Sequence, residues 1–185
     1  MLRSAVFLDR DGTINEDPGY LNDPDQIILL PGAGEGLFLL AQKGYFLVVV
    51  TNQSGVARGL VKEEMLPLIH RRLNQELSRF GAKIDHFSIC VHHPDENCEC
   101  RKPKSKLLMD AAEKFGIDLA NSYFVGDKGS DLAAGRAAGC KGVALVRTGY
   151  GAEMEKKLKS GDANFVGSTL KEVAVWILAK ENASS

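Results

Sequence analysis

Short apolar runs alternate along the chain with longer stretches in which apolar residues recur at helical spacing. The apolar runs are rich in Val, Ile, Phe and Leu, a composition typical of strands buried on both faces of a sheet. We expect strands at residues 5–8, 45–50, 86–91, 123–125, 142–146 and 165–166. We expect helices at residues 34–42, 62–80, 105–115, 130–138 and 170–180.

This alternation of strand and helix predicts an α/β fold, namely a three-layer, Rossmann-like parallel sheet with helices on both faces. Ligands of such sheets bind at the carboxyl ends of the strands, so the residues that follow each strand are the first candidates for a site. The connection 14–31 is long for a compact domain and is either a functional loop or disordered. Residues 1–185 are expected to form a single domain with a frayed tail at 181–185.

Composition narrows the class of protein. The 185 residues suffice for one full-sized domain, and 44% are apolar. Lys and Arg number 23 against 24 Asp and Glu, a balance that argues against nucleic-acid binding through a general positive field. No apolar run approaches the ~20 residues of a membrane helix, and no signal-peptide core is visible. We expect a cytoplasmic monomer with neither a nucleic-acid nor a membrane partner.

Two acidic residues follow the first predicted strand. Asp9 and Asp11 are spaced so that both carboxylates lie on one side of an extended chain. Like charges so close repel unless a cation lies between them, and carboxylates are preferred ligands of Mg²⁺. The alternative is a tight turn, because Asp11-Gly12 is also a common hairpin signal.

Polar groups follow two further strands. Thr51 and the residues after it offer hydroxyl, amide and backbone N–H groups that suit phosphate oxygens, or they cap the next helix. Asp127 and Lys128 follow the fourth strand, whereas Asp131 could simply cap the helix after them. Three strands thus end in acidic or phosphate-binding residues at the same edge of the sheet. Three unrelated turns would have to place these residues there by chance, so the sequence predicts a phosphate and metal site at this edge.

A cluster of Cys and His residues follows the third strand. Cys90 and His92, followed after five residues by Cys98 and Cys100, match a tetrahedral Zn²⁺ site of the Cys₃His type in a loop at 90–100. His93 is an alternative ligand, although strand alternation places His92 on the side of Cys90. Free thiols or a disulfide are the other interpretations, and the cytosol disfavours disulfides.

Four protein ligands leave no open position on the metal, so this zinc is expected to be structural. Arg101 and Lys102 come immediately after the last ligand and could neutralise a transferring phosphoryl group. We therefore expect the zinc to fix the position of these two cations. Cys140 is distant in sequence and has no predicted role.

The strand-end residues together resemble a known superfamily. The segments Asp9-x-Asp11-Gly12-Thr13, Thr51-Asn52, Lys102-Pro103 and Gly126-Asp127 resemble, in that order, the four motifs of the haloacid dehalogenase (HAD) phosphohydrolases. Within that superfamily, the segments DRDGTIN, TNQSGVARG and CRKP resemble those of a capless family of heptose phosphatases. The resemblance implies hydrolysis of the C7 phosphate of D-glycero-D-manno-heptose 1,7-bisphosphate. It also implies a place in nucleotide-heptose synthesis for lipopolysaccharide core or other surface glycans. The histidinol-phosphate phosphatases share several of these motifs and remain the alternative, although residues 17–20 and 54–59 resemble the heptose enzymes.

The resemblance implies a role for each motif residue. Asp9 is implied as the nucleophile that forms an aspartyl phosphate, and Asp11 as general acid and then base. Thr51 and Lys102 are implied to stabilise the phosphoryl group. Magnesium is implied on Asp9, the Asp11 carbonyl and Asp127. The implied substrate-binding residues are Asp17, Pro18, Gly19, Tyr20, Asn52, Gln53, Ser54, Arg101 and Lys128. A non-catalytic zinc-stabilised domain is less consistent with the presence of both Asp9 and Asp11.

Overall fold

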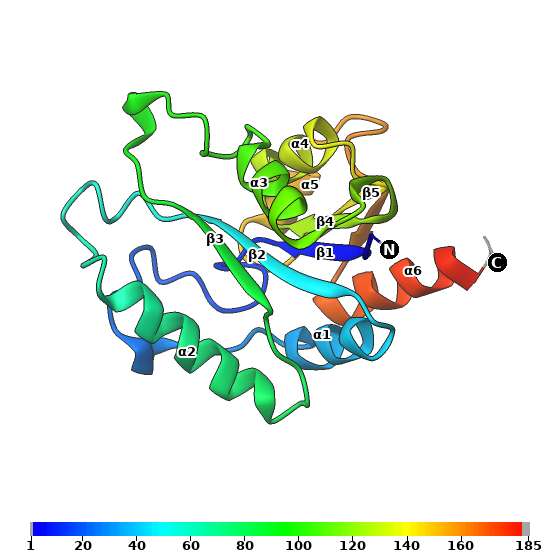
Figure 1. The fold of residues 1–185 in the computed structure, drawn as a ribbon, viewed down its shortest axis with the longest axis horizontal. Coiled ribbons are helices and arrows are strands. Elements are labelled where there is room, and N and C mark those ends of the chain that lie inside the picture. The colour runs from blue at the N-terminus through cyan, green and yellow to red at the C-terminus, as the bar shows by residue number, and fades with distance from the viewer. Residues whose placement is uncertain (1, 183–185) are drawn as a thin grey trace.

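The computed structural model describes residues 2–182, in which six parallel strands form one sheet covered by helices on both faces (Figure 1). The strands are β1 (Ala5–Leu8), β2 (Phe46–Asn52), β3 (His86–Cys90), β4 (Tyr123–Gly126), β5 (Gly142–Val146) and β6 (Phe165–Gly167). The helices are α1 (Ala33–Gln42), α2 (Met65–Ser78), α3 (Lys106–Phe115), α4 (Gly129–Ala137), α5 (Gly151–Glu155) and α6 (Leu170–Asn182). The predicted fold class is confirmed.

The two faces of the sheet carry separate hydrophobic cores. Helices α1, α2 and α6 cover one face, and α3, α4 and α5 cover the other (Figure 1). Within β1, Val6 and Leu8 belong to the first core, whereas Ala5 and Phe7 belong to the second. Because successive side chains of a strand point to opposite faces, every residue of β1 is buried, which explains its uninterrupted apolar sequence.

The strand order β3-β2-β1-β4-β5-β6 places a topological switch between β1 and β4. Val6 pairs with Leu47 of β2 on one side and with Tyr123 of β4 on the other. The chain leaves these two central strands toward opposite edges of the sheet, and a crevice forms where their carboxyl ends diverge. This is the edge to which the sequence assigns its polar residues.

Several element boundaries differ from the sequence-based expectation, most by one or two residues, and one helix was not predicted. Strand β2 continues to Asn52, so Thr51 lies within the sheet rather than after it. Helix α2 begins at Met65, because the residues before it form turns closed by the hydrogen bond from the Met65 backbone N–H to the Lys62 carbonyl. Helix α5 is absent from the prediction, since five residues are too few to display a helical period.

The segment 14–31 is an ordered loop, so the alternative of disorder is wrong. Ile14, Leu21 and Ile27 are buried in the core beside α1 and α2. The Leu30 N–H donates to the Ile14 carbonyl, and the Glu16 N–H donates to the Ile28 carbonyl, which closes the base of the loop.

The last described helix continues past the predicted end. Helix α6 runs to Asn182, and Glu181 accepts hydrogen bonds from Tyr123 Oη at 2.9 Å and Lys141 Nζ at 2.8 Å. Residues 183–185 of the predicted frayed tail lie outside the described part of the chain, and fraying of the tail stays a prediction.

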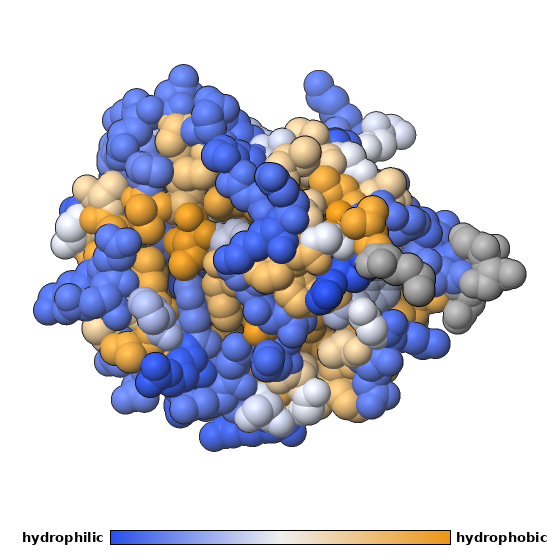
Figure 2. All heavy atoms as spheres, in the orientation of Figure 1, coloured by the Kyte–Doolittle hydropathy of each residue, from blue (hydrophilic) through white to orange (hydrophobic). Residues whose placement is uncertain are grey.

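The surface is mixed in character. Figure 2 shows groups of hydrophobic residues separated by hydrophilic ones over one face of the molecule. The exposed large hydrophobic residues belong to different elements, for example Leu68 on α2, Met109 on α3 and Val175 on α6. Among residues 2–182, none of the helices is both long enough and apolar enough to cross a membrane.

Candidate active site

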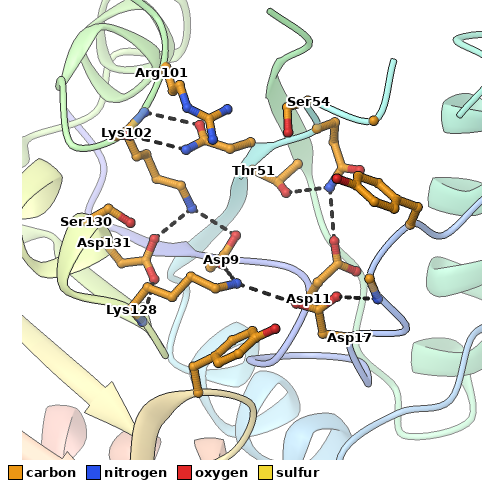
Figure 3. Close-up of a pocket in the computed structure, with 16 residues that line it drawn as sticks. Asp9, Asp11, Asp17, Thr51, Ser54, Arg101, Lys102, Lys128, Ser130 and Asp131 are labelled. Carbon is orange, nitrogen blue, oxygen red and sulfur yellow. Dashed lines mark hydrogen bonds and ion pairs between the residues drawn. The ribbon is translucent and has the colours of Figure 1, made fainter. Parts of the chain in front are cut away.

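A pocket of about 640 Å³ opens at the carboxyl ends of the central strands (Figure 3). The lining residues that the sequence singles out are Asp9, Asp11, Asp17, Gly19, Tyr20, Thr51, Asn52, Gln53, Ser54, Arg101, Lys102, Lys128 and Asp131. Gly55, Ser130 and Tyr150 line it as well, without having been assigned a role from the sequence. Pro18 is not part of the lining, and Asp127 is fully buried.

The two carboxylate oxygens of Asp9 differ in their hydrogen bonds. Its backbone N–H donates to the Val125 carbonyl, which continues the β1–β4 pairing and fixes the residue at the switch point. Asp9 Oδ1 accepts hydrogen bonds from Lys102 Nζ at 2.8 Å and from the Arg10 backbone N–H at 2.9 Å. Among the described residues none donates to Oδ2, and Lys128 Nζ lies 3.8 Å from it.

Lys102 forms the centre of a buried charge cluster. Its side chain is almost fully buried, and Nζ lies 2.8 Å from Asp9 Oδ1, 2.8 Å from Asp131 Oδ1 and 2.7 Å from the Val50 carbonyl (Figure 3). Burial alone would lower the pKa of Lys102, but the charges of Asp131 and Asp9 outweigh it and raise that pKa. Lys102 is thus a fixed cation beside the candidate nucleophile.

Asp131 combines two roles. As a helix cap, its Oδ2 accepts the Lys128 backbone N–H at 2.9 Å at the start of α4. Its other oxygen pairs with Lys102, a contact that the sequence does not reveal because the two residues are remote along the chain. Burial raises the pKa of Asp131 to about 6 despite the nearby Lys102 charge.

The carboxylates fit a divalent cation. Oxygens of Asp9, Asp127 and Asp131 lie within 4.8 Å of one another. Burial, followed by the charge of Asp9, raises the pKa of Asp127 to about 7. Asp127 Oδ2 accepts the Tyr150 N–H, while buried Oδ1 has no hydrogen-bond partner in the described chain. Both oxygens of Asp131 are engaged, one with Lys102 and the other with the Lys128 backbone N–H. Asp9 and Asp127 each keep one oxygen without a hydrogen-bond donor among the described residues, so these are the carboxylates available to Mg²⁺.

Asp11 is held away from this cluster by three donors. Arg10 donates to both of its oxygens at 3.0 and 2.7 Å, Asn15 donates to Oδ1 at 2.9 Å and Gln53 donates to Oδ2 at 3.0 Å. Burial would raise the pKa of Asp11, but Arg10 and the hydrogen bonds lower it overall. With its carboxylate engaged in this way, the backbone carbonyl is the group of Asp11 that could bind a metal.

Arg10 and Gln53 have roles that the sequence does not indicate. Arg10 is fully buried, which is rare for an arginine, and its guanidinium faces Asp11. The Gln53 side-chain amide donates to Thr51 Oγ1 at 2.8 Å as well as to Asp11, so it links two candidate catalytic residues. The structure thus gives Gln53 a bridging contact in addition to its place in the pocket lining.

The outer part of the pocket is lined by Lys128, Asp17, Tyr20 and Arg101. Lys128 Nζ lies 3.6 Å from Asp17 Oδ2, an ion pair that joins the end of β4 to the ordered loop 14–31 (Figure 3). Tyr20, from the same loop, packs against Gly55, where any side chain would collide with the tyrosine ring. Arg101 lines the pocket with a buried guanidinium nitrogen, Nη1, that has no hydrogen-bond partner among the described residues.

The Cys and His residues converge as the sequence predicts. Cys90 Sγ lies 3.5 Å from Cys98 Sγ, and His92 Nδ1 lies 3.1 Å from Cys100 Sγ. A tetrahedral Zn²⁺ with Zn–S bonds of about 2.3 Å requires ligand separations on this scale. His93 instead begins the next turn, where its Nδ1 accepts the Asp95 N–H. The four residues could therefore hold zinc, with His92 as the histidine ligand.

The zinc loop is tied to the pocket by Asn52. The Asn52 side chain accepts the Lys102 backbone N–H at 3.1 Å and donates to the Lys102 carbonyl at 3.2 Å. Lys102 is thus held from one side by the end of β2 and from the other by the loop that ends at Cys100. This arrangement agrees with the expectation that the metal fixes the position of the adjacent cations.

Replacing Cys98 or Cys100 with Ser is expected to remove zinc and to lower both stability and activity. The loop before Arg101 would lose its crosslink, and metal crosslinks contribute folding free energy directly. We expect the zinc content to fall from one ion per chain to almost none, and the melting temperature to fall by several degrees, at roughly 2–4 °C per kcal/mol. Elemental analysis, thermal unfolding and phosphate release measure the three effects.

The matched control for these variants is Cys140→Ser, since Cys140 lies outside the metal-binding group. This variant should keep the zinc content and the rate of the unmodified protein. Zinc-free Cys98→Ser protein with an unchanged melting temperature and an unchanged rate would contradict the structural role of the metal.

Comparison with known proteins places the fold and this site in a family. Residues 99–173 match the family model described as "HAD-hyrolase-like". The chain is 43% identical over 166 residues to D-glycero-beta-D-manno-heptose-1,7-bisphosphate 7-phosphatase of Haemophilus ducreyi, covering 85% of this chain and 91% of that protein. It is 41% identical to the Pseudomonas aeruginosa protein of the same name, covering 89% and 93%. The chain belongs to the heptose-1,7-bisphosphate 7-phosphatase family of HAD phosphatases.

A solved structure of this heptose phosphatase family matches the whole fold. The crystal structure of D,D-heptose 1,7-bisphosphate phosphatase from B. bronchiseptica, complexed with magnesium and phosphate, superposes with a TM-score of 0.89 at 36% identity. The match covers 96% of this chain and 99% of that one. The magnesium of that family member is consistent with the magnesium site expected here. The relatives described above are heptose phosphatases, so the alternative of a histidinol-phosphate phosphatase is not favoured.

Proposed function

We propose that this protein is a Mg²⁺-dependent phosphatase that hydrolyses the C7 phosphate of D-glycero-β-D-manno-heptose 1,7-bisphosphate. The observation that carries the proposal is the Asp9 carboxylate, which lines the pocket with Oδ1 held by buried Lys102 and with no hydrogen-bond donor on Oδ2 among the described residues. The buried Asp127 carboxylate lies within 4.8 Å of it. The substrate follows from the relatives, whose names specify the β anomer. We further propose a cytoplasmic monomer that acts in nucleotide-heptose synthesis.

In the first step, Asp9 Oδ2 attacks the C7 phosphorus and forms an aspartyl phosphate while the bond from phosphorus to the sugar oxygen breaks. Asp11, whose lowered pKa favours the carboxylate, first takes up a proton from solvent and then gives it to the departing sugar oxygen. Arg10, Asn15 and Gln53 all donate to the Asp11 carboxylate, so this clamp has to loosen for the proton transfer. In the second step, Asp11 takes a proton from water, which attacks phosphorus and releases phosphate and free Asp9.

Lys102 and Thr51 stabilise the phosphoryl group during both steps. Lys102 cannot move far from Asp9, because Asp131 and the Val50 carbonyl hold its ammonium group. The Thr51 hydroxyl lies at the end of β2 and is oriented by Gln53. Mg²⁺ bound by the Asp9 and Asp127 carboxylates and the Asp11 carbonyl would supply positive charge next to the transferred group.

The outer pocket accounts for a bisphosphate substrate. Arg101 offers a buried guanidinium nitrogen without a partner, and such a donor suits the phosphate that is not cleaved. Asp17, Pro18, Gly19, Tyr20, Asn52, Gln53, Ser54, Arg101 and Lys128 remain the proposed substrate-binding residues. Histidinol phosphate has no second phosphate and carries positive charge on its amino end, which would lie unfavourably near Arg101.

The rate of phosphate release should distinguish the candidate substrates. We expect kcat/KM for the β-heptose bisphosphate to exceed the values for the α anomer and for histidinol phosphate by at least about tenfold, because only a correctly placed second phosphate satisfies Arg101. Phosphorus NMR of the product should show that the C1 phosphate remains. Faster hydrolysis of histidinol phosphate, or loss of the C1 phosphate, would refute the proposed substrate or the proposed site of cleavage.

A further inference from the structure

The loop after β5 brings an aromatic ring to the pocket. Tyr150 lines the pocket and is 58% exposed, although it is a large side chain with a mostly apolar surface. Lys128 Nζ lies over its ring, 5.1 Å from the centroid. Neither the motifs of the sequence nor the roles proposed above use this residue.

The backbone holds Tyr150 in place. Its N–H donates to Asp127 Oδ2 at 2.9 Å, and Thr148 Oγ1 donates to the Gly12 carbonyl at 2.7 Å. Gly149 has a left-handed backbone with φ of 56°, and any side chain there would collide with Gly12 and Asp127. The loop is therefore fastened to the ends of β1 and β4, and the ring is positioned before any ligand binds.

The ring of Tyr150 gives the Lys128 side of the pocket a flat apolar surface, whereas the other aromatic ring of the lining, Tyr20, belongs to the loop 14–31 and packs against Gly55. The cations and carboxylates of the pocket can hold phosphates and a metal ion, but they offer no flat apolar surface to a carbon skeleton. An aromatic face is electron-rich and attracts cations and the weakly positive C–H groups of a sugar. An exposed aromatic face beside Lys128 can therefore contact the carbon skeleton of the sugar.

We propose, on the basis of the function proposed above, that Tyr150 is a substrate-contact residue whose ring receives the C–H face of the heptose. Lys128 contacts both this ring and Asp17, so the sugar and the phosphate-binding cation would share one wall of the pocket. The contact involves the ring and not the hydroxyl. It binds the sugar in the ground state and the transition state alike, so its loss should appear in KM and not in kcat.

Tyr150→Ala and Tyr150→Leu remove the aromatic face, whereas the matched variant Tyr150→Phe keeps it and removes only the hydroxyl. All three retain the backbone N–H that bonds to Asp127. With the heptose bisphosphate as substrate, we expect KM to rise about tenfold in the Ala and Leu variants with kcat changed less than about twofold. The Phe variant should stay within about twofold of the wild type. Thermal unfolding confirms that each variant is folded.

Inhibition by inorganic phosphate separates the sugar contact from an effect on the phosphate site. Its inhibition constant should be the same in all four proteins, because phosphate has no C–H face. An unchanged KM in both the Ala and Leu variants overturns the inference. A KM of the Phe variant as high as that of the Ala variant also overturns it. A parallel rise of KM and the phosphate inhibition constant also overturns it, since Tyr150 would then act through Lys128. A wild type that fails to hydrolyse the heptose bisphosphate refutes the proposed function, and this inference with it.

Discussion

Asp9→Asn is expected to abolish turnover while leaving the fold and the zinc content intact. An amide oxygen is a poor nucleophile, so the aspartyl phosphate cannot form, and losses of about 10⁴-fold or more are typical when a covalent nucleophile is removed. The exchange preserves shape and removes one negative charge from a group that also contains Asp127 and Asp131. Phosphate release under saturating substrate measures the loss.

The matched control is Asp110→Asn on the exposed surface of α3, where the aspartate pairs with Lys106 of the same helix. This variant should retain the rate and the melting temperature of the unmodified protein. Activity near the wild-type level in Asp9→Asn would remove Asp9 from the role of nucleophile. A large drop in its melting temperature would instead assign Asp9 to the stability of the fold.

Removal of divalent cations is expected to have the second-largest effect. Without a cation, the dianionic phosphate would meet the carboxylates of Asp9 and Asp127, so repulsion would oppose binding and attack. We expect EDTA to reduce the rate to roughly 1% or less and excess Mg²⁺ to restore it. The comparison is made on one protein sample by continuous phosphate release.

Zinc has to be followed in the same experiment, because EDTA can remove it from the cysteine loop as well. Addition of Zn²⁺ alone after EDTA is the control and should not restore the rate. Full activity in a sample shown by elemental analysis to contain no magnesium would contradict the magnesium assignment, whatever the zinc content.

The sequence was sufficient for the sheet and for the residues at its strand ends. The run at residues 5–8 is apolar without interruption because helices cover both faces of β1, so the pattern predicts a central parallel strand. Asp9, Thr51 and Asp127 each lie at a strand end, and parallel strands bring their carboxyl ends together. The cysteine cluster was equally accessible, since its spacing specifies the ligands of one metal ion.

The missed features depend on contacts that a linear pattern does not contain. The partner of Asp131 is Lys102, from a different loop, so only the folded chain reveals the ion pair. Arg10 lies between two motif aspartates, and its complete burial runs against the usual preference of arginine for the surface. The place of Tyr150 near the pocket could have been predicted, because its loop follows β5 in the way that the motif residues follow β1 and β4. It was missed because that loop contains neither an acidic nor a phosphate-binding motif residue.

The buried Lys102 also affects which segments of the fold can separate from one another. Its ammonium group pairs with Asp9 after β1 and with Asp131 of α4. Its backbone follows the zinc loop and is bonded to Asn52 at the end of β2. If any one of these segments separated from the others, a charge would be left without a partner in a dry interior, at a cost comparable to much of the stability of a small domain. We therefore expect the segments that Lys102 joins to separate last on unfolding, while the outer loops fluctuate more freely.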